Sequence, residues 1–245
     1  MRLDLMTWPE VEAHLAQGGG VILPTGSTEQ HGPMGLIGTD AFCATAIAEA
    51  AADRCGALVA PTLALTPAPF NTAFPGTLSV SEPVFRALAG EVLAGLAAQG
   101  FGPIYVLNGH GANLAPLRAA IDALPGARIR LKSWWDFEPV NALRRDWYGD
   151  WEGMHATPSE VAITMATHRQ VDPPEAARTP PRPLSADYIR AHSGDRHGPP
   201  EAHRRDFPDG RVGSHSALAT PEQGRALLDA AARAVAEDYA GFASA

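Results

Sequence analysis

Three side chains that can bind a metal ion lie in one glycine-rich stretch, "GSTEQHGPMGLIGTD", residues 26–40. Glu29 and His31 stand two residues apart, so in an extended chain their side chains point to the same side. Asp40 opens an expected helix, where the positive end of the helix dipole favours an ionised carboxylate. Zn²⁺, Mn²⁺ and Fe²⁺ accept this mixture of carboxylate and imidazole ligands. The stretch therefore predicts half of a metal site.

A second histidine loop, "NGHGAN", follows the apolar run "PIYVLN" and supplies His110. The glycines on both sides of His110 allow the backbone to approach another group closely. A competing interpretation treats Glu29 and His31 as a solvated turn, Asp40 as an ordinary helix start and "NG" as a simple turn. A serine nucleophile is not favoured, because Ser27 in "GSTEQ" lacks the G-x-S-x-G pattern.

The elements that position these loops alternate between strand-like and helix-like patterns. Strands are predicted at 21–26, 57–63, 103–108 and 127–134, and helices at 7–17, 39–55, 81–99, 112–124, 157–168 and 220–242. Thr39 and Gly56 are the predicted cap and stop of the second helix. This alternation predicts an α/β protein with a mostly parallel sheet covered by helices on both faces. In such sheets reactive groups gather at the carboxyl ends of the strands, where both histidine loops lie.

The composition limits the classes of partner. The chain has 245 residues, of which 45% are hydrophobic, and a formal charge of −8 with one lysine, Lys132. Without a basic run we expect a small-molecule substrate and no nucleic acid. The N-terminus lacks an uninterrupted apolar stretch and no window reaches the length of a membrane span, so we expect a cytoplasmic protein with no membrane partner. Cys43 and Cys55 lie about 18 Å apart along one expected helix, which predicts two buried free thiols rather than a disulfide.

The periodic pattern fails from residue 171 to residue 213. This segment, called the arm below, begins with the proline-rich "VDPPEAARTPPRPL" and continues with polar residues that show no period. A stretch of this length inside a compact domain is either a functional loop or an extension packed on another subunit. Five histidines lack matching ligand spacing and are interpreted as solvated surface or as arm residues that reach a neighbour: His14, His168, His192, His197 and His203.

Four motifs together resemble one known family. "PTGSTEQHGPMGLIGTD", "FPGTLSVS", "NGHGAN" and "HATPSE" occur in the order and at about the separations seen in the creatininase (creatinine amidohydrolase) family, and the resemblance runs from Val21 to Gly224. It implies a three-layer α/β/α sandwich over residues 1–245 as a single domain. It also implies a binuclear metal centre that opens cyclic amides or formamides with an activated water. Creatininase itself is a homohexamer, so a homo-oligomer is expected.

The resemblance assigns metal ligands residue by residue. It implies that Glu29 binds one ion, that His31 binds the other together with His110, and that Asp40 bridges both. The family's further glutamate ligand, two residues after that histidine, is Ala112 here. Glu160 matches a glutamate of the family's "HAGE.ETS" motif and is the natural replacement, as a ligand or as a base that binds water. Thr157 and Glu160 also form the pattern of a helix capping box, which is the alternative role.

The expected chemistry needs two divalent ions, Zn, Mn or Fe, which lower the pKa of a shared water to about 7. His155 is the candidate that passes a proton to the leaving group, because histidine titrates near neutral pH. The alternative is that His155 fixes the start of the following helix by a backbone hydrogen bond.

The pocket is predicted from residues near these motifs. Trp134, Trp135 and Asp136 follow a strand and are placed to wall a flat pocket or to donate indole hydrogen bonds, although core packing explains at least one tryptophan more simply. The family motifs add three more predicted substrate contacts: Asn71, Thr77 and Gly111.

Departures from the family pattern affect the substrate more than the metals. Asn71 replaces a frequent histidine, Pro158 replaces a glutamate, and His215 stands at an acidic position. These changes disfavour creatinine itself. The segments "HATPSE" and "LATPEQG" are similar to members that hydrolyse an oxidised cyclic sugar, such as a keto-inositol, at a C–C bond.

Three functional hypotheses follow. The preferred one is a binuclear metal-dependent hydrolase that opens a small cyclic substrate or cleaves an amide C–N bond. The second is a non-catalytic subunit that keeps the fold, suggested by Ala112 and Pro158. The third is a mononuclear enzyme in which only His31, Asp40 and His110 bind metal.

Overall fold

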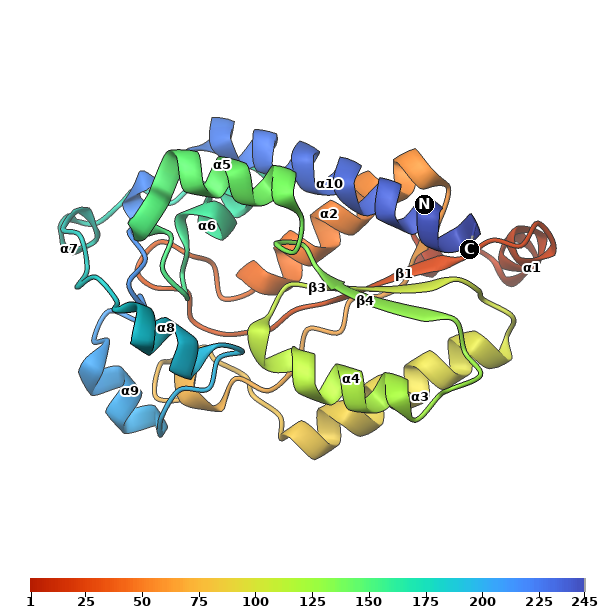
Figure 1. Ribbon diagram of the computed structural model, residues 1–245, viewed down its shortest axis with the longest axis horizontal. Helices are drawn as coiled ribbons and strands as arrows, with labels where there is room; N and C mark the ends of the chain where they lie inside the picture. Colours follow the sequence, from red (N-terminus) through yellow and green to blue (C-terminus); the bar gives the residue numbers. More distant parts are fainter. Residues whose placement is uncertain (245) are drawn as a thin grey trace.

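The computed structural model describes residues 1–244 and is built around one parallel sheet (Figure 1). Its strands are β1 (Val21–Thr25), β2 (Leu58–Val59), β3 (Ile104–Asn108) and β4 (Ile129–Ser133), in the order β2-β1-β3-β4. Thr25 pairs with Asn108, and Asn108 pairs with Ser133. Three strands therefore end level with one another, and the loops that leave them start from the same edge of the sheet.

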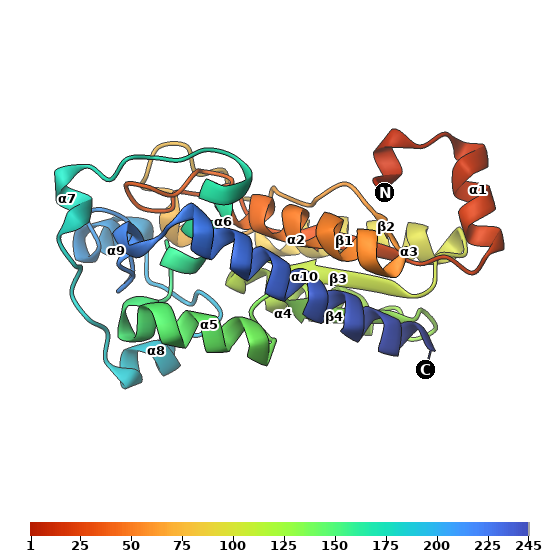
Figure 2. The same cartoon turned by 90° about the horizontal axis from the view of Figure 1, so that it is seen from above.

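Helices cover both faces of the sheet (Figures 1 and 2). One layer contains α2 (Thr39–Cys55), α5 (Glu138–Tyr148), α6 (Pro158–Thr167) and α10 (Pro221–Ser244), and the other contains α3 (Glu82–Ala98) and α4 (Leu114–Asp122). Alternate strand residues serve the two cores: Ile22 and Leu107 pack with the first layer, and Leu23 and Val106 with the second. The expected three-layer α/β/α sandwich is confirmed.

Local signals set most of the helix ends. Thr7 caps α1 (Trp8–Ala16) in a capping box, and Gly56 ends α2 with a left-handed φ of 76°. The prediction that Thr39 caps α2 is wrong: Gly38 is the N-cap, and Thr39 is the first helical residue with its hydroxyl bonded to the Leu36 carbonyl.

Two elements differ from the sequence prediction. The strand expected at 57–63 is only Leu58–Val59. The Ala60 amide still donates to the Ile22 carbonyl oxygen, but the next bond to β1 comes from Leu63 instead of Thr62, so the regular register ends at this point. Helix α5 was not expected at all. It brings Arg144 to the site described below.

The arm forms three short helices: α7 (Glu175–Arg178), α8 (Ala186–His192) and α9 (Pro200–Asp206). Helices of four to seven residues span at most two turns, so they leave no readable period in the sequence. The prediction that His197 and His203 are solvated is wrong. Both imidazoles are buried and pack on the Phe70 ring, with centroid separations of 4.7 and 5.1 Å.

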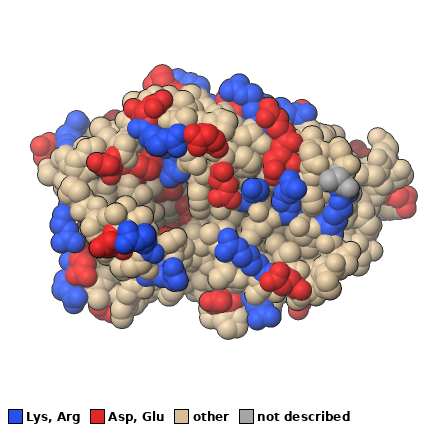
Figure 3. All heavy atoms as spheres, in the orientation of Figure 1, with Lys and Arg blue, Asp and Glu red and all other residues tan. Residues whose placement is uncertain are grey.

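The cysteines are free, as expected, but only Cys43 is fully buried, while Cys55 is half-buried. Burial raises the pKa of the Cys43 thiol well above its ordinary value. Acidic and basic side chains are intermixed over the face drawn in Figure 3, without a continuous basic patch there. Within residues 1–244, no helix combines the length and apolar character needed to cross a membrane.

Helix α3 allows a test of how the second helix layer packs on the sheet. Leu93 of α3 is fully buried, whereas Leu88 of the same helix is 42% exposed. We expect Leu93→Ala to lower the free energy of unfolding by about 2–5 kcal/mol, because it removes buried methyl groups and leaves a cavity. Leu88→Ala is the matched control and should cost less than about 1 kcal/mol. Urea unfolding followed by circular dichroism measures both, and equal losses would contradict this packing.

Candidate metal centre and pocket

The candidate site lies where the level strand ends meet two helix starts. Glu29 and His31 follow β1, and His110 follows β3. Asp40 lies in the first turn of α2, and Glu160 in the first turn of α6. All five side chains are buried. The structure therefore brings together every metal ligand predicted from the sequence.

The first ligand cluster consists of Glu29, Asp40 and His110. The Nδ1 atom of His110 lies 3.2 Å from Glu29 Oε1 and 2.9 Å from Asp40 Oδ2. On the far side of the ring, Nε2 lies 2.8 Å from the Pro67 carbonyl oxygen and is placed to donate to it. A backbone carbonyl that holds the ring proton leaves the other nitrogen free to bind a metal.

The second cluster consists of His31, Asp40 and Glu160. The Nε2 atom of His31 lies 2.8 Å from Asp40 Oδ1 and 3.7 Å from Glu160 Oε1, and Nδ1 is placed to donate to the Glu29 carbonyl oxygen at 3.1 Å. Asp40 belongs to both clusters, with one oxygen toward each imidazole. The resemblance had implied that His110 shares an ion with His31, but the structure groups His110 with Glu29 instead.

The residues present fit divalent cations. With the ring protons held by backbone carbonyls, the inner nitrogens of His31 and His110 face carboxylate oxygens, so a positive charge is required between them. Glu29 Oε1 is buried and accepts no hydrogen bond within the described chain. Burial alone lowers the pKa of His31, but the Asp40 carboxylate outweighs it and raises the pKa to about 10. The raised pKa means that the surroundings of His31 favour a positive charge, here that of a proton. A bound cation would supply the same charge.

His155 faces the same centre from the turn before α6. Its Nε2 lies 2.7 Å from the Gln30 carbonyl oxygen and is placed to donate to it, and the side-chain amide nitrogens of Gln30 and Asn71 lie 3.1 and 3.2 Å from the same atom. Its Nδ1 lies 3.8 Å from Glu29 Oε1. Glu29, His31 and His155 form a third combination of ligand atoms close enough for one ion. Burial and the neighbouring His31 lower the pKa of His155 to about 4, below the expected near-neutral value. The hydrogen bond to the Gln30 carbonyl also ties the turn before α6 to the loop after β1, which is compatible with the alternative role of fixing the helix start.

Glu160 takes part in both of the arrangements predicted for it. Its Oε1 accepts a hydrogen bond from the Thr157 amide at 2.6 Å, and its own amide donates to Thr157 Oγ1 at 3.2 Å, which completes the capping box. The same Oε1 belongs to the cluster around His31. Burial raises the pKa of Glu160 to about 8. Because a carboxylate has two oxygens, capping the helix does not exhaust its capacity to bind a cation.

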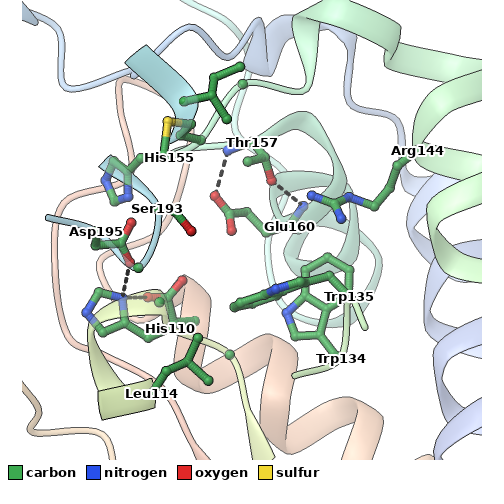
Figure 4. Close-up of a pocket in the computed structure, with 17 residues that line it drawn as sticks. His110, Leu114, Trp134, Trp135, Arg144, His155, Thr157, Glu160, Ser193 and Asp195 are labelled. Atoms are coloured by element: carbon green, nitrogen blue, oxygen red, sulfur yellow. Dashed lines mark hydrogen bonds and ion pairs between the residues drawn. The ribbon is translucent and has the colours of Figure 1, made fainter. Parts of the chain in front are cut away.

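A pocket opens beside the two clusters (Figure 4). Trp134 and Trp135 form one wall with their rings edge to face at 5.4 Å, and His110 lies across the pocket from them. Gly111, the next residue in the chain, also lines the pocket. Trp134 is only 1% exposed, so it also packs in the core, as the simpler interpretation expected. The remaining lining includes Leu114, Arg144, Met154, Ile189, Ser193 and Asp195.

Three residues predicted to contact substrate do not line this pocket. Asn71 lies behind the metal ligands, where its Nδ2 donates to Glu29 Oε2 at 2.8 Å. Thr77 accepts a hydrogen bond from the Gln30 amide at 3.1 Å. Asp136 is exposed and accepts from the Ser133 amide at 2.9 Å. The hydrogen bonds of Asn71 and Thr77 orient Glu29 and the loop that carries it, and that of Asp136 stays within the turn after β4.

Sequence reasoning missed two charged residues of the pocket. Arg144 comes from the unexpected helix α5, where Glu152 holds its guanidinium at 2.9 Å. Asp195 comes from the aperiodic arm. Ala112 stands where the family has a glutamate ligand, so the sequence indicated that one carboxylate was missing. Nothing in the local sequence indicated which distant residue approaches Ala112.

Fold and site together define an α/β protein with candidate divalent-metal ligands at the carboxyl edge of its sheet. The family model described as creatininase, creatinine amidohydrolase, matches residues 4–239, and the chain belongs to the creatininase family.

Relatives in this family differ in what they act on. A creatinine amidohydrolase of Pseudomonas putida is 28% identical over 201 residues, covering 71% of this chain and 77% of the relative. A 3-dehydro-scyllo-inosose hydrolase of Thermotoga maritima is 36% identical over 107 residues, 43% of this chain and 34% of the relative. A mycofactocin precursor peptide peptidase of Mycolicibacterium smegmatis is 36% identical over 110 residues, 42% of this chain and 44% of the relative. The matched part thus spans less than half of the last two relatives.

Solved structures match over nearly the whole chain. A creatininase crystal structure superposes with a TM-score of 0.78 at 25% identity, covering 98% of this chain and 96% of the other. A creatininase variant described as a Zn-Zn type superposes with a TM-score of 0.74 at 26% identity, covering 96% and 95%. Those proteins and the ligand clusters found here support divalent metal binding by this family member.

Proposed function

We propose that this protein is a binuclear metal-dependent hydrolase that opens a small cyclic substrate or cleaves an amide bond. The observation that carries the proposal is the position of Asp40. Its two oxygens face imidazoles from two different loops, at 2.8 and 2.9 Å, and a second carboxylate stands beside each imidazole. One bridging carboxylate with two flanking sets of ligands is the arrangement that a pair of ions requires.

The ligand sets divide between the two ions. Glu29, Asp40 and His110 would hold one ion, and His31, Asp40 and Glu160 the other. Zn, Mn or Fe suits this mixture of oxygen and nitrogen atoms. Such ions would lower the pKa of water to about 7 and polarise the substrate carbonyl.

His155 is the residue that moves the proton. With its Nε2 proton directed at the Gln30 carbonyl oxygen, His155 would present Nδ1 as an acceptor on the side of Glu29. The lowered pKa keeps the imidazole neutral at pH 7, so Nδ1 is able to accept the proton that the attacking water loses. Returning that proton to the departing nitrogen or carbon atom completes hydrolysis and restores the neutral ring.

The pocket walls bind the substrate. Trp134 and Trp135 offer ring faces and edges that suit a small flat ring, across the pocket from His110. Arg144 is the only arginine or lysine in the lining. Its Nε donates to Glu152 and its Nη1 to Asn141, so its Nη2 is the group that would attract an anionic or carbonyl-rich substrate.

Other activities of the same centre are weighed by specific observations. The similarity to an inosose hydrolase favours a keto-inositol and cleavage of a C–C bond as the second candidate. The non-catalytic subunit was suggested by Ala112, but Glu160 already supplies a carboxylate to the His31 cluster. The homo-oligomer, a hexamer as the resemblance implies, remains a prediction. The cytoplasmic location is also a prediction.

Metal analysis and a substrate screen test the proposal. We expect about two equivalents of Zn, Mn or Fe per chain by mass spectrometry, and activity that a chelator abolishes and metal restores. The substrates are cyclic amides, formamides, lactones, keto-inositols and short peptides. Loss of metal and turnover in His31→Ala would support the assignment. A stoichiometry near one would favour the mononuclear enzyme, and a metal-free protein that is indifferent to chelators would favour the non-catalytic subunit.

A further inference from the structure

Asp195 of the arm reaches the first ligand cluster from the far side of the pocket. It lies between α8 and α9, and its Oδ2 is 3.6 Å from His110 Nδ1 (Figure 4). The same oxygen accepts a hydrogen bond from the Ala112 amide at 3.1 Å. No function assigned to the site so far uses this carboxylate.

The backbone on both sides is shaped for this close approach. Asp195 has a left-handed φ of 55°, a conformation that a residue with a side chain rarely adopts, and it follows Gly194 with a φ of 74°. Opposite it, a Cβ atom on Gly111 would lie 2.3 Å from Asp195 Oδ2. Glycine at position 111 is therefore needed for the carboxylate to sit where it does.

The charge balance of Asp195 indicates a cation. Its side chain is only 12% exposed, and its ionic partners within the described residues are two histidines, His110 at 3.6 Å and His197 at 3.9 Å. No lysine or arginine within 4 Å pairs with it in the described chain. A carboxylate removed from water requires a positive charge nearby. The one charge that a protonated His110 offers is already shared by Glu29 and Asp40, at 3.2 and 2.9 Å from the same Nδ1.

One distance fits a fourth ligand on this ion. Asp195 belongs to none of the groups whose ligand atoms all lie within 4.8 Å of one another, so its carboxylate must move toward Glu29 and Asp40 to complete the set. Glu29, Asp40 and His110 offer three atoms, whereas zinc takes four ligands in most sites. Two ligands with bonds of about 2.1 Å in tetrahedral geometry are separated by about 3.4 Å. The separation of 3.6 Å between Asp195 Oδ2 and His110 Nδ1 is close to this value.

We propose that Asp195 is a further metal ligand, supplied by the arm to the ion held by Glu29, Asp40 and His110. This inference rests on the proposed metal-dependent function. It has a mechanical consequence: because the ligand belongs to the arm, binding of the ion fixes residues 171–213 against the pocket. The simpler alternative is that Asp195 only latches the arm through the Ala112 amide.

Asp195→Asn separates the ligand role from the latch, since the amide oxygen still accepts from Ala112 but the charge is lost. The control is Asp172→Asn, which makes the same change at an exposed position of the arm. Mn²⁺ affinity is measured by competition with a fluorescent chelator. The arm is probed by trypsin cleavage after Arg190, whose side chain is 73% exposed, with and without Mn²⁺. Gly111→Ala is a second variant that displaces the carboxylate while leaving Asp195 intact.

In the wild type and in Asp172→Asn, Mn²⁺ should bind at two sites and slow cleavage of the arm. In Asp195→Asn and Gly111→Ala one site should weaken at least about tenfold, and Mn²⁺ should no longer protect the arm. Wild-type affinity in Asp195→Asn overturns the inference, whether or not protection is lost, and leaves the proposed function standing. Absence of Mn²⁺ and Zn²⁺ binding in the wild type overturns the proposed function itself.

Discussion

Asp40→Asn is expected to release both ions and to lower kcat at least about a thousandfold, which corresponds to about 4 kcal/mol of transition-state stabilisation. The amide keeps the shape of the side chain, so the fold should remain. It removes the negative charge that faces both imidazoles and replaces one ligand oxygen with an NH₂ group. Within the described chain, Asp40 is the one residue that the Glu29–Asp40–His110 cluster and the His31–Asp40–Glu160 cluster share.

Metal analysis and thermal melting with and without Mn²⁺ check this result. A metal that binds only the folded state stabilises it by about 2.7 kcal/mol when its concentration exceeds Kd a hundredfold. The wild type should therefore melt at a higher temperature with Mn²⁺, and Asp40→Asn should not respond. The matched control is Asp53→Asn near the end of the same helix, where the side chain is 79% exposed. If Asp40→Asn retained two ions, the bridging role of Asp40 would be wrong.

Glu160→Gln is expected to weaken the ion near His31 and to lower kcat at least about a hundredfold, with little loss of stability. A glutamine oxygen still accepts the hydrogen bond that Glu160 Oε1 receives from the Thr157 amide at 2.6 Å, so the cap of α6 is kept. What disappears is the negative charge beside His31 and Asp40. The variant therefore separates the two roles that the same side chain combines.

Thr220→Ala serves as the control for capping alone. Thr220 and Gln223 form the same kind of cap at the exposed start of α10, away from the metal clusters. Its loss should cost about 1 kcal/mol of unfolding free energy and leave the metal content unchanged. Urea unfolding, metal analysis and turnover are measured on both variants. Full metal content and full turnover in Glu160→Gln would show that Glu160 only caps the helix.

The amino-acid sequence by itself determined the alternation of strands and helices and most of the helix ends. These features depend on hydrophobic period and on capping residues, which act between neighbours in the chain. It also singled out candidate ligands, because Glu29 and His31, Asp40 and His110 stand at strand ends and helix starts that a parallel sheet brings to one edge. The motifs then indicated the family, which the family model confirmed.

The tertiary structure decided how these residues combine. It grouped His110 with Glu29 rather than with His31, and it moved Asn71 from the pocket to a position behind Glu29. These relations join residues that are 42 to 81 positions apart in the chain, as the pairs Asn71–Glu29 and His110–Glu29 show. They depend on strand register and on the packing of layers, which leave no periodic trace in a single sequence.

The arm shows the same limit most clearly. Its helices are too short to give a period, so His197 and His203 were assigned to the surface although they are buried, and Asp195 was not assigned at all. Asp195 approaches Ala112 from 83 residues away. Only the folded chain brings that carboxylate to the pocket, because its position is set by the left-handed turn at Asp195 and by the space that Gly111 leaves open.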